Sequence, residues 1–572
     1  MLIEKVIVKG FRNFEEATVN FNGNSLIIGA NDVGKTNFIH CLRILLDKSM
    51  SERDIEPQET DFHIKDDGTQ VDQFSIEIYF NEIAEDAVLS ILKGYVSDDN
   101  KTVFKFCATK SDLEYKFYVG SSIDELEEVT SRFYLKYINL KYVKSRRDLQ
   151  KFIEIEKKEL LKFSKKDCTP EESTQDSKQT KRISKRLHLI NKRIADLNYI
   201  KTSTQTVNSE LEKLSHNFNG YSVHLDTGAI EVKQFIDKLQ LVASNSGSKM
   251  LLGGDGRNNQ ILMALWKAKS EREFDSEYEV IFYCVEEPEA HLHPHQQRKL
   301  ADYLNNELSG QTIITSHSPQ ITARYSPNSI IHLINNSGKS YAAKNGCSDC
   351  ISDAWDELGY RMSILPAEAF FSKCVFLVEG PSEMLFYTVL AEKLGIDLDF
   401  YNISILAVDG ISFKVYTEIL DAMEIKWVMR TDNDVSKITV GGVEKRNLAG
   451  INRCLKLANL TNEKHRDIST TQDTIIDDGT WQRVSTLFNP KGIYLSKKDL
   501  ENDLSLELPT ELKEFSSKED LNEAVKYLQE KKAIRMRKFL VSYSGNLGSL
   551  NSGELVKPLL KCKEIVESSQ NA

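Results

Sequence analysis

Residues 374–383 of this 572-residue chain read Cys-Val-Phe-Leu-Val-Glu-Gly-Pro-Ser-Glu, and this stretch predicts the fold of the C-terminal half. The apolar run Val375–Val378 contains β-branched residues and no polar interruption, which predicts a strand buried on both faces. Gly380-Pro381 is a turn signal, Ser382 is a candidate N-cap, and a helical pattern follows from Met384 to Leu394. The stretch therefore predicts a strand, a turn and a helix of an α/β domain.

Acidic residues follow this strand and two later ones. Glu379 ends the first strand, and Glu383 lies one turn into the helix, where it can face the same crevice. The strand-like run Ile403–Val408 ends in Asp409-Gly410, and Ile425–Thr431 ends in Asp432-Asn433-Asp434. Open α/β sheets place their chemistry at the carboxyl ends of their strands. We therefore expect these acids to gather at one edge of a sheet.

Gathered carboxylates repel one another unless cations lie between them, so one or two Mg²⁺ or Mn²⁺ ions are their natural occupants. Two ions about 4 Å apart activate a water and stabilise the leaving oxygen of a phosphodiester. A later segment, residues 495–504, offers Asp499, Glu501 and Asp503. The alternative is that the acids are ordinary solvated groups at loop starts. It stays open for Glu383, Asp499 and Glu501, while we interpret Asp503 as a cap or surface acid.

This half of the chain resembles a Toprim domain. Glu379 and Glu383 match the Glu-Gly-x-x-Glu motif of that family, and Asp432 with Asp434 matches its Asp-x-Asp motif.

Length and composition indicate a soluble globular protein of two or three domains, because 572 residues exceed one core and 28% are charged against 40% hydrophobic. No apolar run is long enough to span a bilayer, so we expect no membrane partner. Nine scattered cysteines fit a reducing cytoplasm. Cys347 and Cys350 form a CxxC without a second pair at zinc-site spacing, so we interpret them as incidental thiols.

A net charge of −11 argues against DNA binding by bulk electrostatics and leaves local basic patches as the alternative. Each patch is also compatible with a simple solvated face. The two candidate patches comprise Lys136, Lys141, Lys144, Arg146 and Arg147, and then Lys531, Lys532, Arg535, Arg537 and Lys538.

The N-terminal half contains a nucleotide-binding motif. Strand patterns at Ile3–Val8 and Ser25–Ile28 precede a complete GxxxxGK[ST] loop, and an apolar helix pattern, Phe38–Leu46, follows it. Its glycines let backbone N–H groups face phosphates, its lysine neutralises the terminal phosphates, and its threonine can ligate Mg²⁺. The residues expected to bind ATP here are Gly29, Asn31, Gly34, Lys35 and Thr36.

Downstream segments follow in the order of an ABC-type ATPase. The strand pattern Val280–Val285 ends in a Walker B-like pair, where Glu286 would hold the metal through water and Glu287 would polarise the attacking water. The strand pattern Gln311–Thr315 leads to His317, which resembles the switch histidine. The place of the signature motif is occupied by Gly254, Asp255, Gly256 and Arg257. The run from Glu287 to Pro294 resembles the D-loop of an ABC ATPase. A zinc site at His291, His293 and His295 is the rival interpretation of these histidines.

Two departures from the ABC pattern bear on hydrolysis. The first Walker B acid is Glu286 instead of Asp, and the signature reads Gly-Gly-Asp-Gly instead of Ser-Gly-Gly-Gln. Nucleotide binding tolerates both changes, so we expect an ATP-binding head with weak ATPase activity.

Between the P-loop and the signature lies a long insertion. Apolar positions Leu187, Ile190, Ile194 and Leu197 have helical spacing, which predicts a helical arm that pairs with another copy or packs on its own head. Lys165–Lys181 is polar and predicts a mobile connection. The predicted architecture is an α/β chain: an ABC-type ATPase head (1–150 and 236–345) with a helical dimerisation insert (151–235), a linker (346–366) and a C-terminal Toprim nuclease domain with helices (367–572).

An ABC-type head followed by a Toprim domain resembles the OLD (overcoming lysogenization defect) endonucleases, and among them the nuclease subunits of Gabija anti-phage systems. The resemblance rests on the order of motifs along nearly the whole chain, from Phe11-Arg12-Asn13-Phe14 and the P-loop to residues 499–504. It implies a cytoplasmic, metal-dependent endonuclease or nickase acting on double-stranded DNA under nucleotide control. It also implies a homodimer or homotetramer and a UvrD-like helicase partner.

The family also uses a lysine in a C-terminal helix to stabilise the cleavage transition state. Lys532 matches by position, and the neighbouring Lys531 is not separable from it on sequence. The resulting hypothesis is a site for two Mg²⁺ or Mn²⁺ ions formed by Glu379, Glu383, Asp432, Asp434, Asp499 and Glu501. The rivals are a RecF- or SMC-like DNA-maintenance ATPase without nuclease activity and a Toprim topoisomerase or primase.

Overall fold

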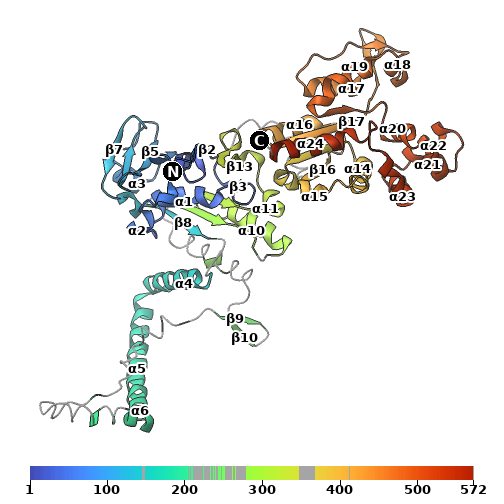
Figure 1. The fold of residues 1–572 in the computed structure, drawn as a ribbon. Helices are drawn as coiled ribbons and strands as arrows, with labels where there is room; N and C mark the ends of the chain where they lie inside the picture. Colours follow the sequence, from blue (N-terminus) through green and yellow to red (C-terminus); the bar gives the residue numbers. More distant parts are fainter. Residues whose placement is uncertain are drawn as a thin grey trace. The chain divides into compact units, whose positions relative to one another are not determined.

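The computed structural model describes residues 1–144, 149–203, 279–290, 292–308, 310–346, 367–410 and 412–570, with short stretches between 205 and 265. The chain forms two compact units. The larger comprises 1–145, 275–289 and 293–572, and the smaller comprises 146–274 and 290–292 (Figure 1).

The first sheet of the larger unit is antiparallel, with strand order β2-β1-β4-β5-β6-β7. Alternating side chains of β1 and β4 are buried, and aromatic rings such as Phe11, Phe74 and Phe106 pack together beneath the sheet. The strands are β1 (Leu2–Phe11), β2 (Phe14–Asn20), β4 (Gln73–Asn81), β5 (Thr102–Thr109), β6 (Tyr115–Gly120) and β7 (Leu126–Val129).

The second sheet, of order β14-β13-β3-β12-β11-β8, is parallel except for β14. Its strands are β3 (Ser25–Ile28), β8 (Ile138–Val143), β11 (Val280–Glu286), β12 (Thr312–Thr315), β13 (Ile330–Asn336) and β14 (Lys339–Ala342). Its helices include α1 (Lys35–Leu46), α10 (Pro294–Asn306) and α11 (Pro319–Thr322), with short α2 (Glu52–Ile55) and α3 (Asp86–Ile91) beside the first sheet. The strands predicted before the P-loop, the Walker B acids and His317 are confirmed, and nearly all of their residues are buried.

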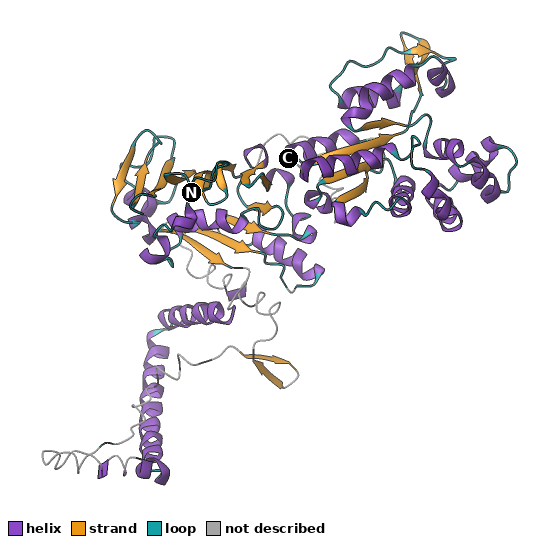
Figure 2. Ribbon diagram, in the orientation of Figure 1, coloured by secondary structure: helices purple, strands orange, loops and turns teal. Residues whose placement is uncertain are grey.

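The third sheet confirms the predicted strand, turn and helix of the C-terminal half. It is parallel, with order β16-β15-β17-β21 (Figure 2). Its strands are β15 (Cys374–Val378), β16 (Ile403–Ala407), β17 (Lys426–Thr431) and β21 (Ile493–Leu495). The predicted N-cap is wrong: Gly380 caps α14 (Pro381–Lys393), and Ser382 lies inside the helix. Proline at the first helical position has its φ preset for a helix, so the helix begins before the serine.

Helices pack around this sheet, with α24 against β15 and β17 and α14 against β16. They are α14, α15 (Leu398–Tyr401), α16 (Phe413–Ala422), α20 (Leu500–Glu507), α21 (Pro509–Ser516), α22 (Leu521–Gln529), α23 (Lys532–Tyr543) and α24 (Lys557–Gln570). An insertion between β17 and β21 contains β18 (Ser436–Val440), β19 (Val443–Asn447), α17 (Ala449–Leu457), β20 (Arg466–Asp467), α18 (Gln472–Asp477) and α19 (Thr480–Phe488).

The smaller unit contains α4 (Leu149–Lys166), α5 (Pro170–Ala195), α6 (Asn198–Ser203), β9 (Val242–Asn245) and β10 (Ser248–Leu251). The mobile connection predicted for Lys165–Lys181 is wrong, because α5 begins at Pro170 and is continuous. Thr169 and Glu172 form a capping box with each other, and this box starts a helix even where the sequence lacks apolar positions. None of the described helices is long and apolar enough to cross a membrane.

Candidate functional site

The carboxyl ends of β15 and β17 bring two of the predicted acids together. These strands are direct neighbours, so Glu379 and Asp432 leave the sheet side by side. The Asp432 backbone N–H donates to Glu379 Oε1 at 2.8 Å, and the Thr431 hydroxyl donates to the same oxygen at 2.5 Å. One Glu379 oxygen is thus fixed by the protein at the sheet edge.

Asp432 is buried at this edge. Burial raises the pKa of its carboxyl to about 8, the negative charge of Glu379 adds to the rise, and Arg430 opposes it. The Ser496 hydroxyl lies 3.4 Å from Asp432 Oδ1. A carboxylate held in such surroundings gains strongly from a nearby cation.

Glu501 in α20 is the clearest candidate for a ligand among the acids that the sequence left open. Both of its carboxylate oxygens are buried, and neither has a hydrogen-bond partner in the described part of the chain. Burial raises its pKa to about 7, Lys532 opposes the rise, and Asp499 and Glu383 add to it. An unsatisfied buried carboxylate costs free energy, which an ion bound to it would offset.

Lys532 opens α23, with its Nζ 3.9 Å from Glu501 Oε2. Burial lowers the pKa of Lys532, but Glu501, Asp432 and Glu383 together raise it more, so the net shift is upward. Lys531 is instead the N-cap residue of the helix. The structure thus brings Lys532 to the acids.

Glu383 is buried in the first turn of α14. Burial raises the pKa of its carboxyl, with Arg430 and Lys532 opposing and Glu379 adding to the rise. Asp499 is also the N-cap residue of α20, since its Oδ1 accepts from Asn502 N at 2.8 Å. Its other oxygen, Oδ2, accepts from Gln529 Nε2 at 2.7 Å. Asp409, by contrast, is exposed in the turn after β16.

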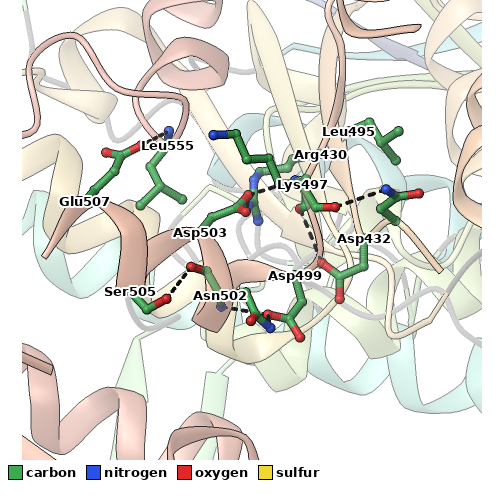
Figure 3. Close-up of polar contacts among 12 residues, drawn as sticks. Arg430, Asp432, Leu495, Lys497, Asp499, Asn502, Asp503, Ser505, Glu507 and Leu555 are labelled. Carbon is green, nitrogen blue, oxygen red and sulfur yellow. Dashed lines mark hydrogen bonds and ion pairs between the residues drawn. The ribbon is translucent and has the colours of Figure 1, made fainter. Parts of the chain in front are cut away.

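Asp503 is not the cap or surface acid that we predicted. Its side chain is buried against Arg430, which donates from Nη2 to Oδ2 at 2.7 Å (Figure 3). Sequence reasoning also missed Arg430, although a cation directly before Thr431 in an apolar strand is a signal that a buried acid lies opposite. The pair packs beneath the candidate site and joins α20 to β17.

A second missed residue is Arg453 in α17. Its guanidinium forms ion pairs with Glu379 Oε1 at 2.6 Å and with Asp434 Oδ2 at 2.8 Å, and it also donates to the Thr431 hydroxyl. No local pattern marks this residue, because it lies 19 positions beyond Asp434 in an insertion.

Across the described ranges, no three His, Cys, Asp or Glu side chains form a preformed metal-binding group. The donors nevertheless fit a hard divalent ion, since they are carboxylates and Glu501 is buried without a partner. Like charges keep such groups apart, so binding an ion would require them to draw together.

The P-loop has the geometry of a phosphate cradle. Gly34 has a φ of 96°, and a Cβ there would lie 2.0 Å from Asn13 Nδ2, so only glycine fits. Lys35 donates from Nζ to the carbonyls of Gly29 and Ala30 at 2.9 and 2.8 Å. Burial lowers the pKa of Lys35 to about 8, with Glu287 opposing. Asn31 and Thr36 are exposed on the same loop, as access to a nucleotide requires.

The Walker B residues end β11 next to this loop. Glu286 accepts from the Tyr142 hydroxyl at 3.0 Å, and its Oε1 is buried without a partner among the described residues. Glu287 has a φ of 45° and lies 3.9 Å from His317 Nε2. Glu289 Oε1 accepts from the His317 backbone N–H at 2.7 Å, so Glu287 and Glu289 both contact the loop that follows β12.

Several predicted residues lie outside the described part of the chain. The rival zinc site is weakened at its two described members, since His293 caps α10 and His295 Nδ1 contacts Arg298. The residues outside the described ranges are Gly254, Asp255, Gly256, Arg257, His291, Arg146, Arg147, Cys347 and Cys350.

Comparisons with known proteins cover both halves. Residues 1–322 match a model described as an AAA ATPase domain, and residues 370–434 match one described as an overcoming lysogenization defect protein-like TOPRIM domain. The chain is 25% identical over 566 residues to Endonuclease GajA of Bacillus cereus (strain VD045), covering 94% of each chain. It is 32% identical over 117 residues to Structural maintenance of chromosomes protein 3 of Saccharomyces cerevisiae, covering 20% of this chain and 9% of that one. The solved SmcHead bound to the C-winged helix domain of ScpA is similar at a TM-score of 0.39 and 17% identity, over 60% of this chain and 97% of that one.

Proposed function

Because the chain belongs to the AAA ATPase domain family and carries an OLD-like TOPRIM domain, we propose that it is a DNA endonuclease or nickase that requires divalent metal and is controlled by nucleotide. The observation that carries the proposal is the sheet edge where Glu379 and Asp432 meet and where Glu501 lies buried without a partner beside Lys532. The 25% identity to an endonuclease across 94% of the chain supports the same activity.

The metal-binding residues in this proposal are Glu379, Glu383, Asp432, Asp434, Asp499 and Glu501. Two bound Mg²⁺ or Mn²⁺ ions supply an activated water and charge neutralisation at the phosphate. The protein side chains would hold the DNA strand in position. Lys532, whose side chain is about half exposed, donates to a phosphate oxygen as negative charge develops there.

The ATPase head is the regulatory half of this proposal. Lys35 and the P-loop backbone bind the terminal phosphates of ATP. Thr36 would ligate the Mg²⁺ that accompanies ATP, and Glu286 would hold this ion through water. In this proposal Glu287 and His317, whose side chains lie 3.9 Å apart, would face the γ-phosphate, and their arrangement would report which nucleotide is bound. Weak hydrolysis is expected because Glu286 replaces the usual aspartate.

The proposed setting is anti-phage defence in the cytoplasm, with double-stranded DNA as the substrate. The exposed helix α5 supports a homodimer or homotetramer, since Ile183, Leu189 and Ile190 present apolar side chains to solvent. A UvrD-like helicase is the proposed partner protein, in keeping with the family resemblance.

A plasmid assay tests the activity. Supercoiled plasmid is incubated with the protein and Mg²⁺ or Mn²⁺, with and without ATP, and open-circle or linear product is expected. Religated topoisomers would instead indicate a topoisomerase. Glu379→Ala should abolish cleavage while the protein remains folded and oligomeric, and retained nicking by that variant would remove the site assignment.

A DNA-maintenance ATPase without nuclease activity is the second candidate. The local 32% identity to a chromosome-maintenance protein favours it. It predicts that the plasmid stays unchanged in every metal and nucleotide condition.

A further inference from the structure

Arg453 joins two acids that come from different strand ends. Its Nη1 donates to Glu379 Oε1 at 2.6 Å and its Nη2 donates to Asp434 Oδ2 at 2.8 Å, while its side chain is only 10% exposed. A planar guanidinium with two donors on two carboxylates fixes both their separation and their orientation.

The helix that carries Arg453 is pressed against the acidic loop. The Gly450 backbone N–H donates to the Asp434 carbonyl at 3.0 Å, and a Cβ at Gly450 would lie 2.3 Å from the Asp432 carbonyl oxygen. Only glycine allows this approach, and Arg453 follows three residues later, on the same side of the helix. The position of Arg453 is therefore set by backbone contacts with the loop as well as by its own ion pairs.

In both carboxylates, one oxygen accepts hydrogen bonds from the protein and the other oxygen does not. Glu379 Oε1 accepts from Thr431, Asp432 and Arg453, and Asp434 Oδ2 accepts from Arg453. Within the described part of the chain, Glu379 Oε2 and Asp434 Oδ1 have no hydrogen-bond donors. Metal-binding carboxylates are oriented in this way by residues behind them.

We propose that Arg453 is a positioning residue that orients Glu379 and Asp434 for a divalent cation. This inference rests on the proposed function. The charge of Arg453 also fits the site. Two divalent ions would neutralise four of the six proposed carboxylates, and the positive charges of Arg453 and Lys532 would balance the other two. Because it holds both carboxylates in one orientation, Arg453 raises the affinity of the site for metal without contacting the metal.

Direct metal binding tests this role without depending on cleavage. Mn²⁺ binding to the full-length protein, without DNA, is measured by calorimetry for the wild type and Arg453→Gln. Loss of an outer-shell partner should weaken binding by about ten- to a hundredfold. Arg453→Lys should recover part of this loss, because it keeps the charge and loses the paired donors. Lys456→Gln is the matched control: it removes the same charge from an exposed position one turn along α17 and should bind Mn²⁺ as the wild type does.

Gly450→Ala provides a second variant that keeps Arg453 but pushes α17 away from the loop, and it should also weaken Mn²⁺ binding. Melting of the metal-free variants identifies any that are unfolded. Wild-type affinity in Arg453→Gln, with wild-type protein still cleaving DNA, would overturn the role of Arg453 and leave the proposed function intact. Tighter binding in that variant would also overturn it, because Arg453 would then be a competitor of the metal. Wild-type protein that binds no Mn²⁺ would overturn the proposed function, and this inference with it.

Discussion

Replacing Arg430 by methionine is expected to destabilise the C-terminal domain by about 3 kcal/mol, the lower end of the cost of breaking a buried ion pair. The Arg430 and Asp503 side chains are 4% and 5% exposed and 2.7 Å apart. Without the guanidinium, Asp503 would stay buried with a single donor among the described residues, the Lys497 backbone N–H at 3.3 Å. That remaining donor is the reason to expect the lower end of the range.

Native-state hydrogen exchange of the β15 and β17 amides measures this cost in the domain itself. A loss of about 3 kcal/mol accelerates exchange through domain opening by more than about a hundredfold. The double variant Arg430→Met with Asp503→Leu should recover most of the stability, because a buried ion pair is replaceable by apolar residues of similar size. Equal acceleration in the single and double variants would refute the explanation, since the damage would then not come from the unpaired acid.

Three further variants test other parts of the structure. Gly34→Ala should weaken binding of a fluorescent ATP analogue by at least about tenfold, because left-handed backbone costs alanine about 1–2 kcal/mol and its Cβ meets Asn13; unchanged affinity would contradict the P-loop geometry. Glu501→Met should raise the stability of the metal-free protein by about 1–3 kcal/mol by removing an unsatisfied carboxylate, while abolishing metal-dependent cleavage; a fall in melting temperature would show that Glu501 is paired. Thr169→Ala should accelerate amide exchange at Glu172, because the first turn of α5 loses its cap, whereas unchanged exchange would mean that the box does not start the helix.

The sheet of the C-terminal half was predictable because its strands are short, mostly apolar runs. The strand expected at Val375–Val378 is observed at Cys374–Val378, and the one expected at Ile425–Thr431 at Lys426–Thr431. Parallel strands deliver their carboxyl ends to one edge, so the meeting of Glu379 with Asp432 followed from topology alone. The N-cap was missed by two residues, since the proline at the first helical position outweighed the candidate serine cap.

The two arginines of the site, unlike Lys532, were not predicted from the sequence. Arg453 belongs to an insertion whose path back to the sheet depends on the close approach of Gly450, and neither residue has a local pattern that reveals this contact. Asp503 was misread because its burial depends on Arg430, which is distant in sequence. Periodicity locates residues relative to their own element, whereas the pairing of charges depends on the packing of several elements.

The separate origins of the acids and of the arginines explain the electrostatics of the candidate site. The acids cluster because strand ends converge, and burial then raises the pKa of Asp432, Glu383 and Glu501. Arg430 and Arg453 come from β17 and the insertion, and each already holds an acid, so neither neutralises Glu501. Glu501 has only Lys532 at 3.9 Å, and that side chain is about half exposed. The unfavourable charge is therefore concentrated at Glu501, where the half-exposed Lys532 is the nearest cation among the described residues, and a bound cation would act there both as a cofactor and as a stabiliser of the fold.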